Sequence, residues 1–146
     1  EEDYGPRIGV LTILLPTAPF RTARSIKAAH SVYSEVAPLP VFSATAMDHP
    51  PQWSWVSVES IGKGSQRILQ PLFPPTDGLL RKRQELPSTY RVDGNVMIMD
   101  AADFRSRGNY VYEEVSFVIT PEEEAVDVNT EQDFAFCEFL LKRTSC

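Results

Sequence analysis

An uninterrupted apolar run, IGVLTILLP at residues 8–16, limits the possible folds of this chain more than any other stretch. It follows Arg7, ends on a proline, and is too short to cross a bilayer. Strands that are apolar on both faces are typical of parallel sheets, in which helices cover each face. The run therefore predicts a buried strand with neighbouring strands on both sides, and hence an α/β fold.

A helix is predicted directly after this strand. The Pro-rich turn PTAPFR leads into TARSIKAAHSVYSE, residues 22–35, in which Thr22 can act as the N-cap. Apolar residues recur at helical spacing along one side of this segment. Strand, loop and helix together make half of a βαβ unit, the building block of a parallel sheet.

The remaining apolar segments predict shorter strands, which would complete a mostly parallel sheet with flanking helices. Strands are expected at residues 41–46, 53–60, 67–73, 95–99, 115–119 and 126–129. The sequence favours a turn at Asp93-Gly94, a short helical or irregular link at 102–109, and a loop over the Pro-rich segment 74–90. GKGS at 62–65 lacks the strand–loop–helix context of a phosphate-binding loop, so we interpret it as a turn.

The C-terminal segment TEQDFAFCEFLLKR, residues 130–143, predicts a second helix. Thr130 and Asp133 have the spacing of a reciprocal cap, in which each side chain bonds the other residue's backbone amide. Cys137 falls on the apolar side, and two cations stand in the last turn, where they suit the helix dipole.

Composition and charge restrict the class of protein. The 146 residues are 42% hydrophobic and 23% charged, so we predict one globular domain over residues 1–146. The net charge is −6 and the one basic run is Arg81-Lys82-Arg83, which argues against a nucleic-acid or membrane partner. Two cysteines near the C-terminus, without zinc-ligand spacing to the two histidines, indicate a reduced, cytoplasmic protein.

Three separated stretches resemble, in order, segments of one enzyme family. LLPTAPFR (14–21) is similar to LQPTSPLR, and RKRQELPSTYRVDGNVMIMD (81–100) to R-R-Q-D-L-P-x-x-Y-x-x-N-G-A-I-Y-I. ITPEEEAVDVNTEQDFAFCEFLL (119–141) is similar to an M-P-E-E-R-S-x-D-I-D-T-E-x-D-F-x-x-A-E-x-L-L ending. The family is that of the CMP-sialic acid synthetases, or acylneuraminate cytidylyltransferases, with their legionaminate, pseudaminate and KDO relatives. The resemblance extends over essentially the whole chain.

The resemblance implies a partial nucleotide-diphospho-sugar transferase fold of Rossmann-like type, with or without a small β arm for dimerisation. It also implies a homodimer that transfers the cytidylyl group of CTP to a sialic-acid-like keto sugar acid with Mg²⁺. Family members open with a loop, R-x-x-S-K-x-x-P-x-K-N, that grips the triphosphate; these residues, which start at Glu1, contain no such loop. One hypothesis is therefore an enzyme that obtains this loop from elsewhere. The alternatives are a catalytically inactive, truncated module for sugar binding or dimer assembly, and a decayed or excised fragment.

Asp127 and Asn129 are the candidate metal ligands by this resemblance. The family has two Asp at these positions, which bind the Mg²⁺ that neutralises the reacting groups. Alternate residues of a strand face the same side, so the spacing can present two oxygens to one ion. Asn129 offers a neutral carbonyl oxygen in place of a carboxylate. The structural alternative is that Asn129 only organises the helix start beside Thr130.

Five further positions match family residues that lie at the ligands. They are Arg21 and Arg83 as catalytic groups that hold anions, and Thr17, Gln84 and Tyr90 as substrate-binding groups. Thr17 and Arg21 follow the C-terminal end of a predicted strand, where open α/β sheets bind ligands. A helix-start ion pair for Arg21 and a solvated basic loop for Arg83 are the structural alternatives. The family's Gln before Pro-Thr is Leu15 here, which puts recognition of the sugar in question.

Other conspicuous residues have simpler interpretations. Trp53 and Trp55 fall on one side of a predicted strand, where they would belong either to the core or to an oligomer interface. The acidic run at 122–124 is interpreted as a solvated turn. His30 and His49 are interpreted as structural or surface residues.

Overall fold

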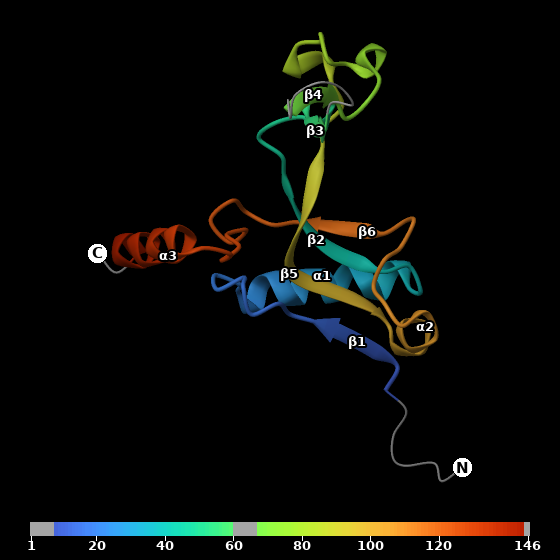
Figure 1. Ribbon diagram of the computed structural model, residues 1–146. Coiled ribbons are helices and arrows are strands. Elements are labelled where there is room, and N and C mark those ends of the chain that lie inside the picture. The colour runs from blue at the N-terminus through green and yellow to red at the C-terminus, as the bar shows by residue number, and fades with distance from the viewer. Residues whose placement is uncertain (1–7, 60–66, 145–146) are drawn as a thin grey trace. The chain divides into compact units, whose positions relative to one another are not determined.

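The computed structural model describes residues 8–59 and 67–144, which form two compact units (Figure 1). The first, here called the sheet unit, contains residues 8–45 and 91–144. The second, here called the hairpin unit, lies between residues 46 and 90. GKGS at 62–65 lies outside the described residues.

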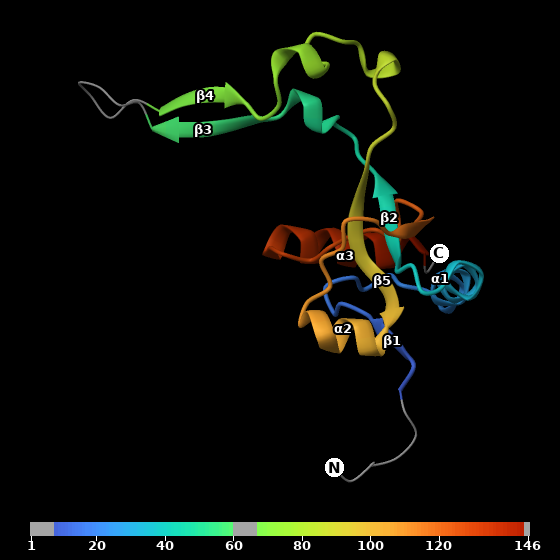
Figure 2. The ribbon, with the colours of Figure 1, turned by 90° about the vertical axis from the view of Figure 1, so that its right-hand side faces the viewer.

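The sheet unit is built on four strands in the order β1-β5-β2-β6. They are β1 (Val10–Ile13), β2 (Val41–Ala46), β5 (Tyr90–Asp100) and β6 (Ser116–Ile119). β1 pairs antiparallel with β5, and β2 pairs parallel with β6. Figure 2 shows β2 and β5 side by side with their arrowheads in opposite directions. β1, β2 and β6 therefore point one way, and β5 runs against them.

The prediction of a mostly parallel sheet is wrong, because two of the three strand pairings are antiparallel. The cause lies in how the chain returns from β2 to β5. A parallel neighbour needs a crossover connection, whereas a chain that turns back beside its own strand runs antiparallel. The Met47 amide donates to the Thr89 carbonyl at 2.9 Å, so the two chain segments are still paired beyond the strand ends. The predicted position of β1 between two strands is also wrong, since β1 lies at the edge of the sheet.

Two helices cover opposite faces of this sheet. α1 (Ala23–Val36) covers one face, and α2 (Ala101–Arg107) lies on the other beside the 108–115 segment. The core beneath α1 contains Ala29, Tyr33, Val41, Val96 and Ile98. The core of the other face contains Phe42, Met97 and Met99, with Leu11, Ile13, Phe104 and Tyr112 packed against them. Successive residues of β5 thus point to opposite faces of the sheet and belong to two separate cores, as expected of a strand.

The helix starts follow their local sequence signals. The Thr22 side chain accepts the Ser25 amide at the start of α1, which confirms Thr22 as the N-cap. At the start of α3 (Glu131–Thr144), Asp133 accepts the Thr130 amide at 2.8 Å and Thr130 accepts the Asp133 amide at 3.2 Å. This reciprocal cap was predicted and is confirmed. No helix in the described part of the chain is long and apolar enough to span a bilayer.

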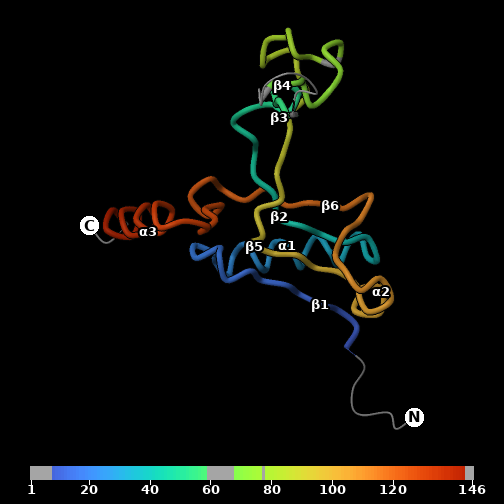
Figure 3. The backbone as a smooth tube through the Cα atoms, viewed as in Figure 1, coloured from blue at the N-terminus to red at the C-terminus, as the bar shows by residue number. Residues whose placement is uncertain are grey.

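Residues 126–129 do not form the predicted strand. Figure 3 traces the chain from β6 to α3 as an irregular stretch. The Val128 amide donates to the Thr17 carbonyl at 2.9 Å, but this is an isolated bond. A four-residue apolar–polar alternation is too short a signal to establish a strand without a ladder partner. The predicted alternation of Asp127 and Asn129 on one strand face therefore does not apply.

The Asp93-Gly94 prediction was half correct. Gly94 has the left-handed φ of +72°, as a turn glycine would. However, β5 continues through it from Tyr90 to Asp100. A Cβ at this position would lie 2.6 Å from the Leu15 side chain, so the glycine also allows the 14–21 turn to approach β5 closely.

The hairpin unit is a two-stranded antiparallel ribbon with short helical turns. β3 (Trp55–Glu59) pairs with β4 (Arg67–Pro71), and Val56 lies opposite Gln70. The predicted loop over 74–90 contains two 3-10 turns, η2 (Pro75–Asp77) and η3 (Arg83–Glu85). A third, η1 (Pro51–Trp53), precedes β3. Core packing of Trp55 is ruled out in this arrangement, since it is 50% exposed.

Candidate functional site

The three motif segments are joined by hydrogen bonds at one end of the sheet unit. The C-terminal ends of β1, β2 and β6 all lie at this end, because these strands point the same way. Arg21 from the first segment donates to the Asn95 carbonyl in the second. Asn95 in turn donates through its side-chain amide to the Glu124 carbonyl in the third, at 2.8 Å. We call the linked parts of these segments, residues 14–21, 93–95 and 124–129, the sheet-end corner.

Arg21 is the centre of the corner, and its guanidinium is already bonded. Its Nε donates to the Asn95 carbonyl and its terminal nitrogen to the Leu15 carbonyl, both at 2.5 Å. The planar fork of Arg suits two acceptors at once, which Lys could not match. In the described residues, Arg21 thus bonds two backbone carbonyls, in place of the ion pair at the helix start that was the alternative interpretation. The remaining N–H groups of Arg21 are the ones left to meet an anion.

The interpretation of the acidic run at 122–124 as a solvated turn is wrong for Glu124. Glu122 and Glu123 are exposed, but Glu124 is half-buried and its carboxylate accepts bonds from the hydroxyls of Thr22 and Ser25. It therefore places a negative charge at the N-terminus of α1, where the helix dipole favours an anion. That helix end is accordingly occupied by the chain's own carboxylate.

Thr17 lies against the segment that carries Asp127. Its carbonyl accepts the Val128 amide, so the turn after β1 and the segment before α3 are neighbours. Thr17 also lines an apolar pocket of about 370 Å³ with Phe20, Phe134 and Cys137 among its walls. Burial raises the pKa of the Cys137 thiol, with a smaller contribution from Asp133, so the thiol stays protonated at neutral pH.

Asp127 and Asn129 lie together, but not as two oxygens facing one ion. The Asn129 side-chain amide nitrogen donates to the Asp127 carboxylate at 2.7 Å. The Asn129 backbone amide donates to Asp133. Asn129 therefore also helps to organise the start of α3, which is the structural alternative that the sequence offered for it. Mg²⁺ is commonly held by one or two carboxylates together with waters and substrate phosphates. The half-buried Asp127 fits such a role, with Asn129 as the residue that positions it.

Within residues 8–59 and 67–144, no group of three or more His, Cys, Asp or Glu side chains could hold a metal. An ion at Asp127 would therefore bind without a cluster of such side chains, with further oxygens such as those of water or of a bound phosphate. This is how Mg²⁺ binds when a substrate shares it, and it differs from a structural ion cage.

The other three predicted residues belong to the hairpin unit. Arg83 and Tyr90 line a small pocket of about 150 Å³ together with Met47 and Leu86. Arg83 is exposed and makes a long bond of 3.4 Å to the Met47 carbonyl, so its charge is accessible. Gln84 is exposed on η3 and does not line this pocket. The structure thus brings Thr17, Arg21, Asp127 and Asn129 into one unit, and Arg83, Gln84 and Tyr90 into the other.

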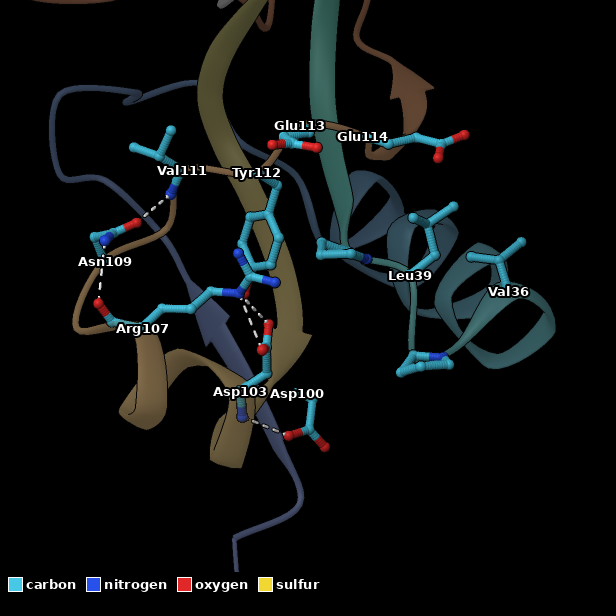
Figure 4. Close-up of a pocket in the computed structure, with 12 residues that line it drawn as sticks. Val36, Leu39, Asp100, Asp103, Arg107, Asn109, Val111, Tyr112, Glu113 and Glu114 are labelled. Atoms are coloured by element: carbon cyan, nitrogen blue, oxygen red, sulfur yellow. Dashed lines mark hydrogen bonds and ion pairs between the residues drawn. The ribbon is translucent and has the colours of Figure 1, made fainter.

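A wide cavity of about 1140 Å³ lies at the opposite end of the sheet unit (Figure 4). Asp100, Asp103, Glu113 and Glu114 line it, with Arg107 as the one cation among its lining residues. Arg107 is paired with Asp103 at 2.8 Å and stacks over the Tyr112 ring at 4.6 Å. Four carboxylates around one neutralised cation repel a phosphate or a sugar acid. None of the predicted site residues lines this cavity.

Two residues of the corner were missed by sequence reasoning. Asp93 and Asn95 are 4% and 0% exposed, and Asp93 accepts the Ser43 hydroxyl and the Asn95 amide through one carboxylate oxygen. Its second oxygen and the Asn95 side-chain oxygen have no partner among the described residues. The signal was a pair of polar residues inside an otherwise apolar strand, on either side of the glycine. Burial of such groups requires partners, which marks them as structural or ligand-binding positions.

A search of family models with this sequence returned no match. The resemblance to the cytidylyltransferases therefore stands on the three motif segments.

Proposed function

We propose that this chain provides the metal-holding and sugar-acid-binding part of a Mg²⁺-dependent cytidylyltransferase that acts on a sialic-acid-like keto sugar acid. One observation carries the proposal: the bonds from Arg21 to Asn95 and from Asn95 to Glu124 join one residue from each motif segment. Segments that were similar to one family, and separate in sequence, thereby form one corner. This corner lies where open α/β sheets bind their ligands.

The residues of the corner have complementary tasks in this proposal. Asp127 provides the carboxylate that would hold Mg²⁺, and Asn129 orients it through the 2.7 Å bond. The ion would supply charge neutralisation for the CTP phosphates and the attacking sugar hydroxyl. Arg21 would attract the sugar carboxylate through the N–H groups that the backbone carbonyls do not use. The triphosphate-gripping loop of the family has no counterpart in the described residues, so the proposal assigns no residue to it.

The direct test is Mg²⁺-dependent binding of a panel of sialic-acid-like sugar acids by the purified chain, measured by calorimetry, because the proposal assigns the chain the metal and the sugar acid and no residue for the triphosphate. We expect Mg²⁺-dependent affinity for at least one sugar acid. Asn129→Ala should lower this affinity about 10–100-fold, the usual cost of removing a residue that orients a metal ligand. Glu123→Gln, which removes an exposed carboxylate from the nearby turn, is the control and should be neutral. Binding that is absent with every sugar acid, or equal in Asn129→Ala, contradicts the proposal.

Asn129→Asp gives a second readout that needs no sugar acid. It would restore the family's second carboxylate beside Asp127, and a metal site should then bind Mg²⁺ more tightly. A larger Mg²⁺-induced rise in melting temperature than in the wild type supports metal binding. A Mg²⁺-induced rise that is no larger than in the wild type would show two repelling carboxylates and no ion, and would contradict metal binding.

The alternative, a catalytically inactive module for dimer assembly, is favoured by one specific observation. Both faces of the β3–β4 ribbon expose large apolar side chains: Trp55, Val56, Ile68 and Leu69 are 41–65% exposed. A two-stranded ribbon is marginal in water and needs cover. We propose that it packs against a second copy as a dimerisation arm. Leu69→Glu should then shift the chain toward monomer in light scattering, whereas Gln70→Glu on the same strand should not; equal effects would contradict the arm.

A further inference from the structure

Two side-chain oxygens in the middle of β5 are buried and unpartnered in the part of the chain that the structure describes. They belong to Asp93 and Asn95, which lie on either side of Gly94 and are 4% and 0% exposed. One is the second oxygen of the Asp93 carboxylate, and the other is the side-chain oxygen of Asn95. Buried polar atoms of folded proteins are nearly always bonded. A ligand that is not one of the described side chains is therefore expected at these two atoms.

The hydrogen bonds that the two side chains do make fix the chemistry of the atoms that remain. The Asn95 side-chain nitrogen donates to the Glu124 carbonyl at 2.8 Å, and a carbonyl can only accept, so the oxygen is the atom left over. Asp93 accepts the Ser43 hydroxyl and the Asn95 amide through its other oxygen. Both remaining atoms are acceptors. Their ligand must therefore donate hydrogen bonds or carry a positive charge.

The two residues are held in one small, fixed group. The Asn95 amide donates to the Asp93 carboxylate at 3.0 Å, which keeps this carboxylate against the next residue but one in the strand. Gly94 between them has the left-handed φ of +72°, and the following Val96 amide donates to the Ser43 hydroxyl at 2.8 Å. These bonds fix both side chains in place before any ligand arrives.

The charge of the group favours a cation over a water molecule. Among residues 8–59 and 67–144, no Lys, Arg or His side chain forms an ion pair with Asp93. Arg21 bonds the same part of β5, but it donates to the carbonyls of Asn95 and Leu15. A buried carboxylate is costly unless a positive charge accompanies its hydrogen bonds. A water could bond both oxygens, but it would leave the carboxylate without a counter-charge.

We propose that the unpartnered oxygens of Asp93 and Asn95 bind one monovalent metal cation, sodium or potassium. A single positive charge balances the single carboxylate. Mg²⁺ usually keeps several of its waters, and side chains buried as deeply as these leave little room for a hydrated ion. The bound cation stabilises the part of β5 whose carbonyl Arg21 bonds. This site is separate from the Mg²⁺ site proposed at Asp127.

The test compares the whole chain in sodium chloride, potassium chloride and choline chloride at equal ionic strength. Screening by salt is the same in all three, and choline is too large for such a site, so a difference reports specific binding. In sodium or potassium we expect a saturable rise in melting temperature of at least about 3 °C over choline. The amides of Asn95 and Val96 should also exchange more slowly with solvent. Equal melting temperatures and exchange rates in the three salts overturn the proposal.

Asp93→Asn places the cation at this carboxylate. The variant keeps one oxygen for the bonds from Ser43 and Asn95, but it removes the charge and one cation ligand. It should lose the cation-dependent rise, and in choline it should melt no lower than the wild type, because the unpaired charge is gone. Glu123→Gln, which removes an exposed carboxylate, is the control and should keep the full rise.

A further variant separates this site from the proposed Mg²⁺ site. Asp127→Ala should keep the response to sodium or potassium, so a failure of the Mg²⁺ proposal leaves this one intact. A rise that is as large in Asp93→Asn as in the wild type, or that Asp127→Ala removes, places the cation elsewhere and overturns the proposal. If Asp93→Asn does not fold, the salt comparison and the exchange of the Asn95 amide in the wild type decide the case.

Discussion

The candidate residues of the sheet unit are held by hydrogen bonds, whereas those of the hairpin unit are exposed. Arg21 clamps two backbone carbonyls, and Asp127 accepts a bond from Asn129. Arg83 makes a single long bond, and Gln84 stands exposed on η3. The candidate side chains of the sheet unit are therefore part of its hydrogen-bonded structure, whereas those of the hairpin unit are accessible at the surface. A substitution in the sheet unit should change stability and ligand binding together, while one in the hairpin unit should change binding or assembly alone.

The largest difference is expected in apolar packing. Ile98 is 0% exposed between α1 and the sheet, whereas Ile68 on β4 is 41% exposed. Ile98→Ala should lower the free energy of unfolding by about 2–5 kcal/mol, because it leaves a cavity in a packed core. Ile68→Ala should lower it by less than about 1 kcal/mol in the dilute monomer. Chemical denaturation measures both, and similar losses would contradict the contrast between the units.

Arg21→Ala should have the next largest effect. It leaves the carbonyls of Leu15 and Asn95 without their charged donor, and the expected loss is about 2–4 kcal/mol. Arg21→Lys should recover part of it, since Lys reaches one acceptor but not both. Arg24→Ala removes the same charge from an exposed position on α1 and is the control. Equal melting temperatures for Arg21→Ala and Arg24→Ala would show that the clamp contributes nothing.

Arg83→Ala tests the same comparison in the hairpin unit, where we expect an effect on binding and little effect on stability. Its exposed side chain and long bond predict a stability change within about 0.5 kcal/mol. If Arg83 holds an anionic group, as the family resemblance implies, the same variant should weaken sugar-acid binding about tenfold, the cost of one charged hydrogen bond. A loss of stability with unchanged binding would reverse the roles that we assign to the two units.

The smallest effect is expected at the cap of α3, and it depends on pH. Bonds from the Thr130 hydroxyl and from the Asn129 and Thr130 amides hold the pKa of Asp133 below its usual value. A carboxyl with a lowered folded pKa stabilises the fold above its unfolded pKa, and that contribution is lost as pH falls through the folded pKa. Asp133→Asn should therefore be less stable than the wild type at pH 7, and the difference should shrink below about pH 4. A difference that is constant from pH 7 to pH 3 would contradict the cap as its source.

Local signals predicted the helices and their starts well. Thr22 and the Thr130–Asp133 pair were identified from side-chain chemistry within one helical turn, and the structure confirms both. The strand at 41–46 was also predicted within its observed bounds. These features depend on residues close together in sequence, which a single sequence displays directly.

Strand direction and the corner could not be predicted in the same way. Whether β5 runs with or against β2 depends on which strands become neighbours, and apolar content does not encode this. The acceptors of Arg21 include the Asn95 carbonyl, 74 residues away, and a backbone acceptor leaves no mark in the sequence. Asp93-Gly94 signals a left-handed residue correctly, but the neighbouring strands decide that β5 continues through it. The motif resemblance identified which segments matter, and the structure added which of their atoms are already bonded.

Titration of the chain with CMP-sialic acid and Mg²⁺, followed by backbone amide NMR, tests the central claim most directly. The account predicts saturable, Mg²⁺-dependent shifts at Thr17, Arg21, Asp127 and Asn129, which Asp127→Ala abolishes while the α1 amides keep their positions. Shifts that are absent, that are unchanged without Mg²⁺, or that centre on the acidic cavity around Asp103 and Arg107 would contradict the claim that the sheet-end corner is a ligand site.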